Sequence, residues 1–126
     1  MTRRTSVVDY SRVINVSLSS IFHIGDSVQV TPVAWAIAVQ RQLQLFYGDE
    51  GNFLQFPMFT MELPQPTIQE PITVNRYNAS SFIKVNRIHV TSVAAGSVHQ
   101  IGSTNYINSE SRIKHIRQFH RDPNME

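Results

Sequence analysis

The sequence predicts an all-β protein: a small, pseudo-duplicated β-sandwich or barrel-like domain with an extended central insertion. Two stretches that lie 77 positions apart, 13–27 and 90–104, resemble each other residue by residue. Both alternate apolar and polar residues and are rich in β-branched side chains, which is typical of strands. A unit used twice favours a pseudo-symmetric scaffold, because each copy must bury a similar face. We expect the 126 residues to form one β-rich domain, 1–126.

We place the repeat units at about 12–43 and 89–119, with an insertion at 44–75 between them. In each copy an isoleucine and a glycine precede small polar residues. Glycine suits a bulge or a positive φ, and the polar residues after it can bond their own backbone. We therefore interpret the motif as structural rather than catalytic. Its residues are Ser20, Ile24, Gly25, Asp26, Ser27, Ile101, Gly102, Ser103 and Thr104.

The elements follow the same pattern along both copies. Residues 22–30, 83–85 and 88–91 read as strands, while 19–20 and 95–97 read as turns before a short second strand. Two equivalent segments are ambiguous, because 34–47 has apolar residues at both parities and 110–120 is more polar. Strand and helix both stay open there, and strand is favoured.

The insertion is rich in proline and aromatic residues, so long hydrogen-bonded elements are not expected in it. One interpretation is an extended flap over the core. The other is a docking surface for another chain, because clustered aromatic residues mark interfaces. The predicted interface residues are Phe53, Phe56 and Phe59.

The sequence shows no recognisable catalytic centre. It has no cysteine, which excludes thiol catalysis and cysteine-ligated metals. Its histidines lack metal-site spacing, and its acidic residues are scattered, against the convergent carboxylates of a hydrolase. We therefore expect no enzyme activity, no catalytic residues, no metal and no cofactor. No stretch approaches the roughly 18 apolar residues of a membrane span, and we expect synthesis in the cytosol.

A basic strip near the C-terminus raises a nucleic-acid alternative, a β-barrel that binds nucleic acid through Arg112, Lys114 and Arg117. The formal net charge is only +2, however, and apolar residues between these cations resemble packing positions. We therefore expect no nucleic-acid partner. Charged residues are 16% of the chain, below the roughly 25% of typical soluble domains, which favours packing against other proteins.

Blocks in order along nearly the whole chain resemble the GerP spore germination proteins, and the GerPE family among them. The stretch Ser-Ser-Ile-Phe-His-Ile-Gly-Asp-Ser at 19–27 is the most distinctive of them. The sequence departs from the family pattern at 9–11 and around 77–78, outside these blocks. The matching blocks are 4–8, 19–27, 36–42, 56–59, 100–104 and 112–118.

The resemblance implies a non-enzymatic structural component of the spore coat layers, made in the mother cell of an endospore-forming bacterium. It further implies that the protein is needed for normal coat structure and for passage of small hydrophilic germinants to receptors beneath. Its expected partners are other GerP proteins and coat proteins, in hetero- or homo-oligomers. The alternatives left open are the nucleic-acid-binding β-barrel and a hydrolase acting on coat or cortex.

Overall fold

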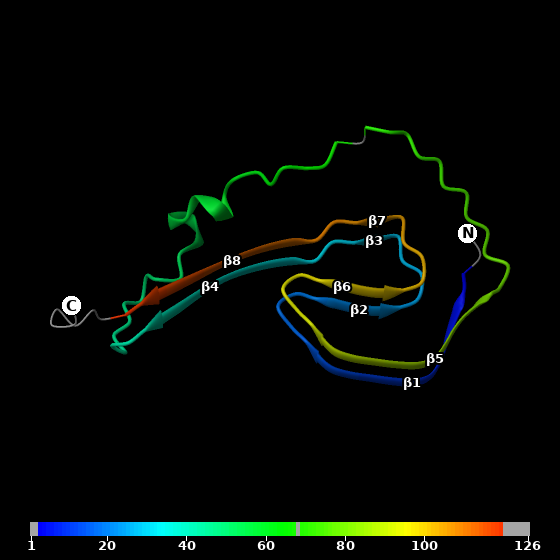
Figure 1. Ribbon diagram of the computed structural model, residues 1–126, viewed down its shortest axis with the longest axis horizontal. Coiled ribbons are helices and arrows are strands. Elements are labelled where there is room, and N and C mark those ends of the chain that lie inside the picture. Colours follow the sequence, from blue (N-terminus) through cyan, green and yellow to red (C-terminus); the bar gives the residue numbers. More distant parts are fainter. Residues whose placement is uncertain (1–2, 68, 120–126) are drawn as a thin grey trace, which may run out of the picture. The chain divides into compact units, whose positions relative to one another are not determined.

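The structure is a computed structural model that describes residues 3–67 and 69–119 (Figure 1). The predicted all-β class is confirmed, and the helical content is two short 3₁₀ turns, η1 and η2. In chain order the elements are β1 (Thr5–Val16), β2 (Ile21–Ile24), β3 (Gln29–Val30), β4 (Val33–Arg41), η1 (Phe53–Gln55), η2 (Pro57–Phe59), β5 (Phe82–Val93), β6 (Val98–Ile101), β7 (Tyr106–Ile107) and β8 (Glu110–Gln118).

Each strand of the first copy pairs with its equivalent in the second copy. The described strands form four two-stranded sheets, β1–β5, β2–β6, β3–β7 and β4–β8. The first three are parallel, and in each of them residue i faces residue i + 77, from Thr5 opposite Phe82 to Val30 opposite Ile107. In Figure 1 β4 and β8 run side by side in the same direction. The resemblance at a spacing of 77 is therefore also the pairing register.

Within the confirmed all-β class, each described sheet has two strands, one from each copy. Copies that pair through equivalent residues lie beside each other along their backbones instead of packing face to face. Equivalent apolar residues then meet directly, as Val13 meets Val90 and Ile24 meets Ile101. Pairing already begins at Thr5 and Phe82, upstream of the boundaries 12–43 and 89–119, which stay predictions.

Both copies change direction through equivalent left-handed turns. Leu18 and Ser19 have φ of 51° and 56°, and Ala95 and Gly96 have φ of 58° and 72°. The amide of Gly96 donates to the carbonyl of Leu18 at 2.9 Å, so the two turns are bonded to each other. The turns that the sequence places at 19–20 and 95–97 are present.

The described residues divide into two compact units. The first lies within Met1–Ala34 and Pro64–Ser111, and the second within Trp35–Leu63 and Arg112–Glu126. The core is small. The buried hydrophobic residues of the first unit are Val30, Ala34, Ile83 and Val93, and that of the second is Phe59. A single domain, 1–126, stays a prediction.

The two ambiguous segments are largely strands. β4 covers Val33–Arg41 and β8 covers Glu110–Gln118, whereas 42–47 contains no strand and residue 120 lies outside the described residues. The regular structure in the described part of the insertion is the two 3₁₀ turns. Residues 60–67 and 69–82 are exposed. No helix in the described part of the chain is long and apolar enough to cross a membrane.

Candidate functional site

The two copies of the glycine motif lie next to each other at the ends of β2 and β6. Gly25 and Gly102 have φ of 149° and 137°, outside the range that side-chain-bearing residues favour. A Cβ at Gly102 would lie 2.0 Å from the carbonyl oxygen of Gly25, whereas one at Gly25 would first meet the His23 side chain at 3.2 Å. Position 102 therefore requires glycine, because a side chain there would collide with the backbone of the other copy.

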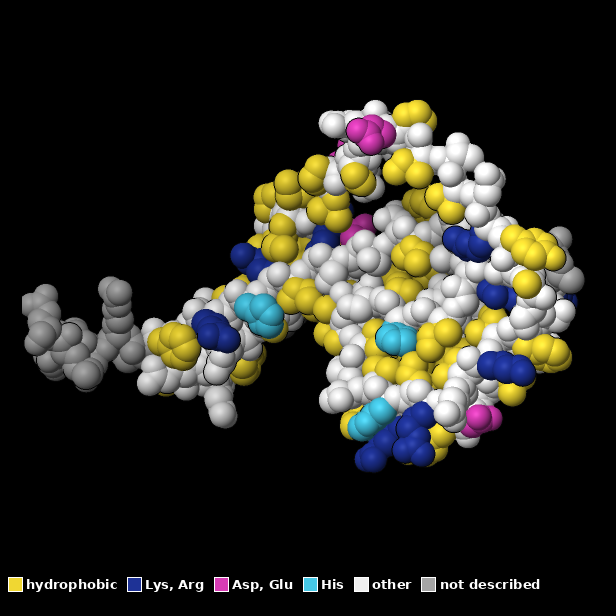
Figure 2. Space-filling model, turned by 45° about the vertical axis from the view of Figure 1, so that its right-hand side comes forward, with side chains coloured by type: hydrophobic (Ala, Val, Ile, Leu, Met, Phe, Trp, Pro, Cys, Tyr) yellow, Lys and Arg dark blue, Asp and Glu magenta, His cyan; other side chains and the backbone are white. Residues whose placement is uncertain are grey.

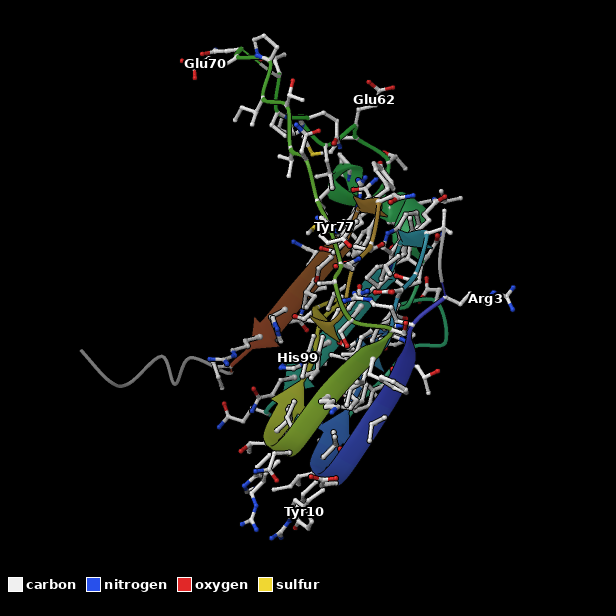
Figure 3. All side chains as sticks on the ribbon, turned by 90° about the vertical axis from the view of Figure 1, so that its right-hand side faces the viewer. Arg3, Tyr10, Glu62, Glu70, Tyr77 and His99 are labelled. Carbon is white, nitrogen blue, oxygen red and sulfur yellow. The ribbon has the colours of Figure 1, made fainter. Side chains whose placement is uncertain are left out.

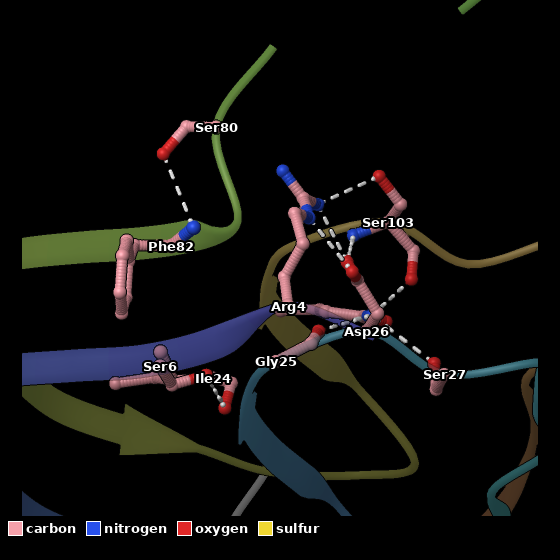
Figure 4. A network of polar contacts seen from close by, with 10 residues as sticks. Arg4, Ser6, Ile24, Gly25, Asp26, Ser27, Ser80, Phe82 and Ser103 are labelled. Atoms are coloured by element: carbon pink, nitrogen blue, oxygen red, sulfur yellow. Dashed lines mark hydrogen bonds and ion pairs between the residues drawn. The ribbon is translucent and has the colours of Figure 1, made fainter. Parts of the chain in front are cut away.

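A polar network ties this turn pair to the chain before β1 (Figure 4). The Arg4 guanidinium donates from Nε and Nη2 to the two carboxylate oxygens of Asp26, at 2.7 and 2.6 Å. It also donates to Ser103 Oγ at 3.1 Å, while the backbone amide of Ser103 donates to Asp26 Oδ1 at 2.7 Å. One carboxylate thus joins both copies and the N-terminal segment.

These contacts lower the pKa of Asp26 to about 2, mainly through the hydrogen bond from Arg4 and next through the Ser103 amide. The same hydrogen bond to Asp26 raises the pKa of Arg4. A carboxylate with so low a pKa is a poor proton acceptor near neutral pH, since general bases work best with a pKa near the operating pH. The arrangement serves as a clamp and is not suited to acid–base chemistry.

The remaining motif residues strengthen the same region. The Gln100 amide donates to Ser27 Oγ at 3.1 Å and to the carbonyl of Gly25 at 3.3 Å. Thr104 Oγ1 donates to the carbonyl of Tyr106 at 3.4 Å. Ser20 lies in the turn before β2, and its hydroxyl is buried. The structure thus brings together the predicted motif residues from 24–27 and 101–104, but leaves Ser20 at the preceding turn.

An open cavity of about 580 Å³ lies beside this clamp in the first unit. Arg4, Ser103 and Thr104 line one part of it, and Arg76 and Tyr77, which follow the predicted insertion, line another part. Sequence reasoning missed Arg4 and Gln100 as members of this site. No pattern could have found the ion pair, because Arg4 and Asp26 are 22 residues apart and lie on different strand ends.

The three phenylalanines of the predicted interface form an aromatic cluster with Trp35 in the second unit. The rings of Phe53 and Phe59 are 4.8 Å apart, and each lies 5.9 Å from the Trp35 ring. Phe56 contacts Phe59 at 6.4 Å. Phe59 is 2% exposed, so this ring is covered by its own chain. An interface role for the cluster stays a prediction.

The basic strip is divided between packing and solvent. Arg112 is buried, donates to the carbonyls of Met58 and Met61 at 2.8 and 2.6 Å, and lies over the Trp35 ring. The Lys114 ammonium lies 5.0 Å from the Phe56 ring centre, and Arg117 is exposed. Two of the three cations thus hold the aromatic cluster. Nothing in this arrangement favours the nucleic-acid alternative.

Among the described residues, no group of three or more histidine and acidic side chains is placed to hold a metal ion. The polar site offers a neutralised carboxylate, hydroxyls and backbone groups that bind one another. Its geometry fixes the register of the two copies.

Comparison with known proteins assigns the family. The profile of the spore germination protein GerPE family matches residues 5–125. The chain belongs to the GerPE family of spore germination proteins. A probable spore germination protein GerPE from Bacillus cereus is 31% identical over 123 residues, which cover 97% of this chain and 96% of the relative. No solved structure matches the chain. Membership of the GerPE family supports a role in germination.

Proposed function

We propose that this GerPE-family chain is a non-enzymatic structural component of the spore coat layers. It is made in the mother-cell cytosol and keeps the coat organised and permeable, so that small hydrophilic germinants reach the receptors beneath. Its partners are other GerP proteins and coat proteins. The observation that carries the proposal is the family match over 5–125, which supports a role in germination for nearly the whole chain.

The architecture supports a structural role in two ways. The polar groups of the turn pair at Gly25 and Gly102 bind one another, and the Asp26 carboxylate is held by Arg4 rather than presented to a substrate. The chain also leaves many large apolar side chains exposed, including Ile14, Val28 and Tyr106. Figure 2 shows hydrophobic side chains on the surface of one face. Exposed apolar surface of this extent is characteristic of proteins that associate with neighbours.

The deciding experiment is germination of spores that lack the gene, measured before and after chemical removal of the coat. We expect intact mutant spores to respond slowly to small nutrient germinants, and decoated mutant spores to respond as fast as decoated wild-type spores. Passage through the coat is then the step that the protein serves. A defect that survives decoating contradicts the proposal, because the site of action then lies beneath the coat.

Complementation links this phenotype to the fold. A gene that carries Gly102→Val should fail to restore germination of intact spores, because its side chain collides with the backbone of Gly25. Gly48→Ala is the matched control, since a Cβ at Gly48 meets nothing within 4 Å. The control gene should restore germination fully. Immunoblots of both spore preparations show whether each variant accumulates.

A further inference from the structure

Each strand of the first unit has a partner along one edge only. β1, β2 and β3 pair with β5, β6 and β7, and no third strand joins any of these sheets in the described part of the chain. The opposite edges therefore present backbone N–H and C=O groups without a strand beside them. Such edges are templates for pairing with another chain.

The hydrogen bonds show which amides face outward on β1. The amides of Thr5 and Ser17, twelve positions apart, both donate to the second copy, to the carbonyls of Ser81 and Val93. Alternate residues of a strand direct their N–H and C=O groups to opposite sides. In the β1–β5 register Asp9 and Ile14 have no partner, so this alternation shifts at both positions. From Thr5 to Val8 the pairing is continuous, and the even-numbered Val8 therefore directs its N–H and C=O groups away from β5.

These edges lack two of the usual protections against pairing, short strands and prolines. β1 and β5 are twelve residues long and contain neither proline nor glycine. Their charged residues are Asp9, Arg12, Lys84 and Arg87. The described residues of 60–81, between η2 and β5, are exposed. Val7, Val8 and Val16 of β1 are 40%, 38% and 44% exposed.

The number of repeats points in the same direction. In repeat proteins a unit cannot bury its apolar face alone, so at least about three stacked units and polar end caps are usual. This chain supplies two copies, and no third strand joins β1 or β5 in the part that the structure describes. A neighbour that continues the stack would need the same profile as the copies already present.

We propose that a second copy of this chain stacks head to tail on these edges, its β1–β3 lying parallel and in register beside β5–β7 of the first. The free edge of β1–β3 faces the same direction along the stack as the edge of β5–β7 that already pairs with β1–β3 inside the chain. The free edge of β1–β3 in one molecule can therefore pair with the free edge of β5–β7 in the next. Every contact across the new interface repeats an internal one: Val8 with Val85, Val13 with Val90, and Ile24 with Ile101.

Polar contacts also repeat without conflict. Arg87 lies over the Tyr10 ring at 5.2 Å, in the middle of the β1–β5 ladder, and stacking would place a second tyrosine on its other side. Tyr10 is labelled in Figure 3. The Asn15 amide donates to Ser92 Oγ at 3.2 Å, a contact that a further copy can extend into a ladder. The interface is heterologous, so each added copy exposes the same edge again and the stack remains open.

The stacking proposal rests on the proposed function, because it names the surface through which the coat protein would assemble. The stacking proposal can nevertheless be wrong while the proposed function is correct. Its test uses the purified full chain, whereas the proposed function is tested in spores. An absence of self-association leaves the decoating experiment unaffected, and a defect that survives decoating leaves the stacking result unaffected.

Disulfide trapping tests both the partner and the register, because the natural chain has no cysteine. Arg12 and His89 are exposed and face each other in the ladder, so in a stack Arg12 of one copy also faces His89 of the next. Neighbouring strands are about 4.8 Å apart, within the reach of a disulfide. An Arg12→Cys protein is mixed with an equal amount of a His89→Cys protein and oxidised mildly.

We expect covalent dimers in the mixture and little dimer in either protein alone. The control partner is Lys84→Cys, an exposed residue that faces Val7, five positions and roughly 16 Å along the strand from Arg12. It should give at least about tenfold less dimer with Arg12→Cys. Dimers that form mainly within one variant, or equally with Lys84→Cys, overturn the proposal in favour of an isologous or random contact. Absence of any dimer also overturns it.

A proline variant tests the role of the edge in the unmodified assembly. Val8→Pro removes an outward N–H that β5 does not use, so the fold should survive, whereas Val8→Thr removes the same apolar side chain and keeps the amide. Sedimentation should show the wild type and Val8→Thr as stacks that grow with concentration, and Val8→Pro as a monomer. Circular dichroism confirms that both variants are folded. Equal association of the two folded variants contradicts pairing at this edge.

Discussion

Position 102 is the glycine position at which the fold tolerates a side chain least. Its φ of 137° is strained for other residues, and a Cβ would lie 2.0 Å from the Gly25 carbonyl oxygen. Because the neighbour is backbone of the paired copy, relief requires opening the ladder. Gly102→Val should lower the free energy of unfolding by more than about 1–3 kcal/mol, the range for backbone strain alone. Urea denaturation checks this against Gly48→Ala, which should match the wild type; an unchanged midpoint for Gly102→Val contradicts the argument.

Asp26 should make the stability depend on acid pH. Its pKa falls from 3.8 to about 2 in the folded chain because Arg4 and the Ser103 amide bind the carboxylate. A folded-state pKa below the unfolded value gives stability that is present above pH 4 and is lost as the pH falls through about 2. The wild type should therefore melt at a higher temperature than Asp26→Asn above pH 4.

This difference in melting temperature should shrink steadily between pH 4 and pH 2, measured by circular dichroism at fixed ionic strength. Asp9→Asn is the control, because Asp9 is an exposed carboxylate of β1, and its pH profile should follow that of the wild type. A difference between wild type and Asp26→Asn that stays constant down to pH 2 would show that the ion pair is not the cause.

At the scale of elements, the sequence predicts the strands well because their apolar residues repeat in both copies. The turns at 19–20 and 95–97 and the glycine motif follow from local chemistry, since glycine and small polar residues have few alternatives there. Pairing is different. An echo at a spacing of 77 is compatible with copies packed face to face or side by side, and only the backbone hydrogen bonds, as from Ser17 to Val93, distinguish them.

The site is less predictable than the strands for a related reason. Gly96 has φ of 72°, and a Cβ there would lie 2.8 Å from the Glu110 carbonyl oxygen, yet its equivalent in the first copy is Ser19. Because only one copy requires glycine at this position, comparing the two copies of the sequence does not reveal the requirement. Likewise Arg112 looks like a surface cation by sequence, but it is buried because Met58 and Met61 supply carbonyl oxygens from 51 or more residues away.

At the scale of the whole molecule, the two copies should hold together even when the chain between them is cut. The insertion contributes no strand to the described sheets, and Arg76 is the only lysine or arginine between Arg41 and Lys84. Brief trypsin treatment should therefore cut first after Arg76, which lies in an exposed stretch. Arg76→Gln should resist this cut and serves as the control.

The fragments 1–76 and 77–126 should then elute together from a sizing column in buffer and separate in concentrated urea. The reason is that the ladder between β1 and β5 joins residues of different fragments at ten positions, with β2–β6 and β3–β7 continuing the same register. A flexible connection adds only chain entropy to such pairing, so cutting it weakens the association without abolishing it. Fragments that separate in buffer would show that the insertion, and not the pairing of equivalent strands, holds the copies together.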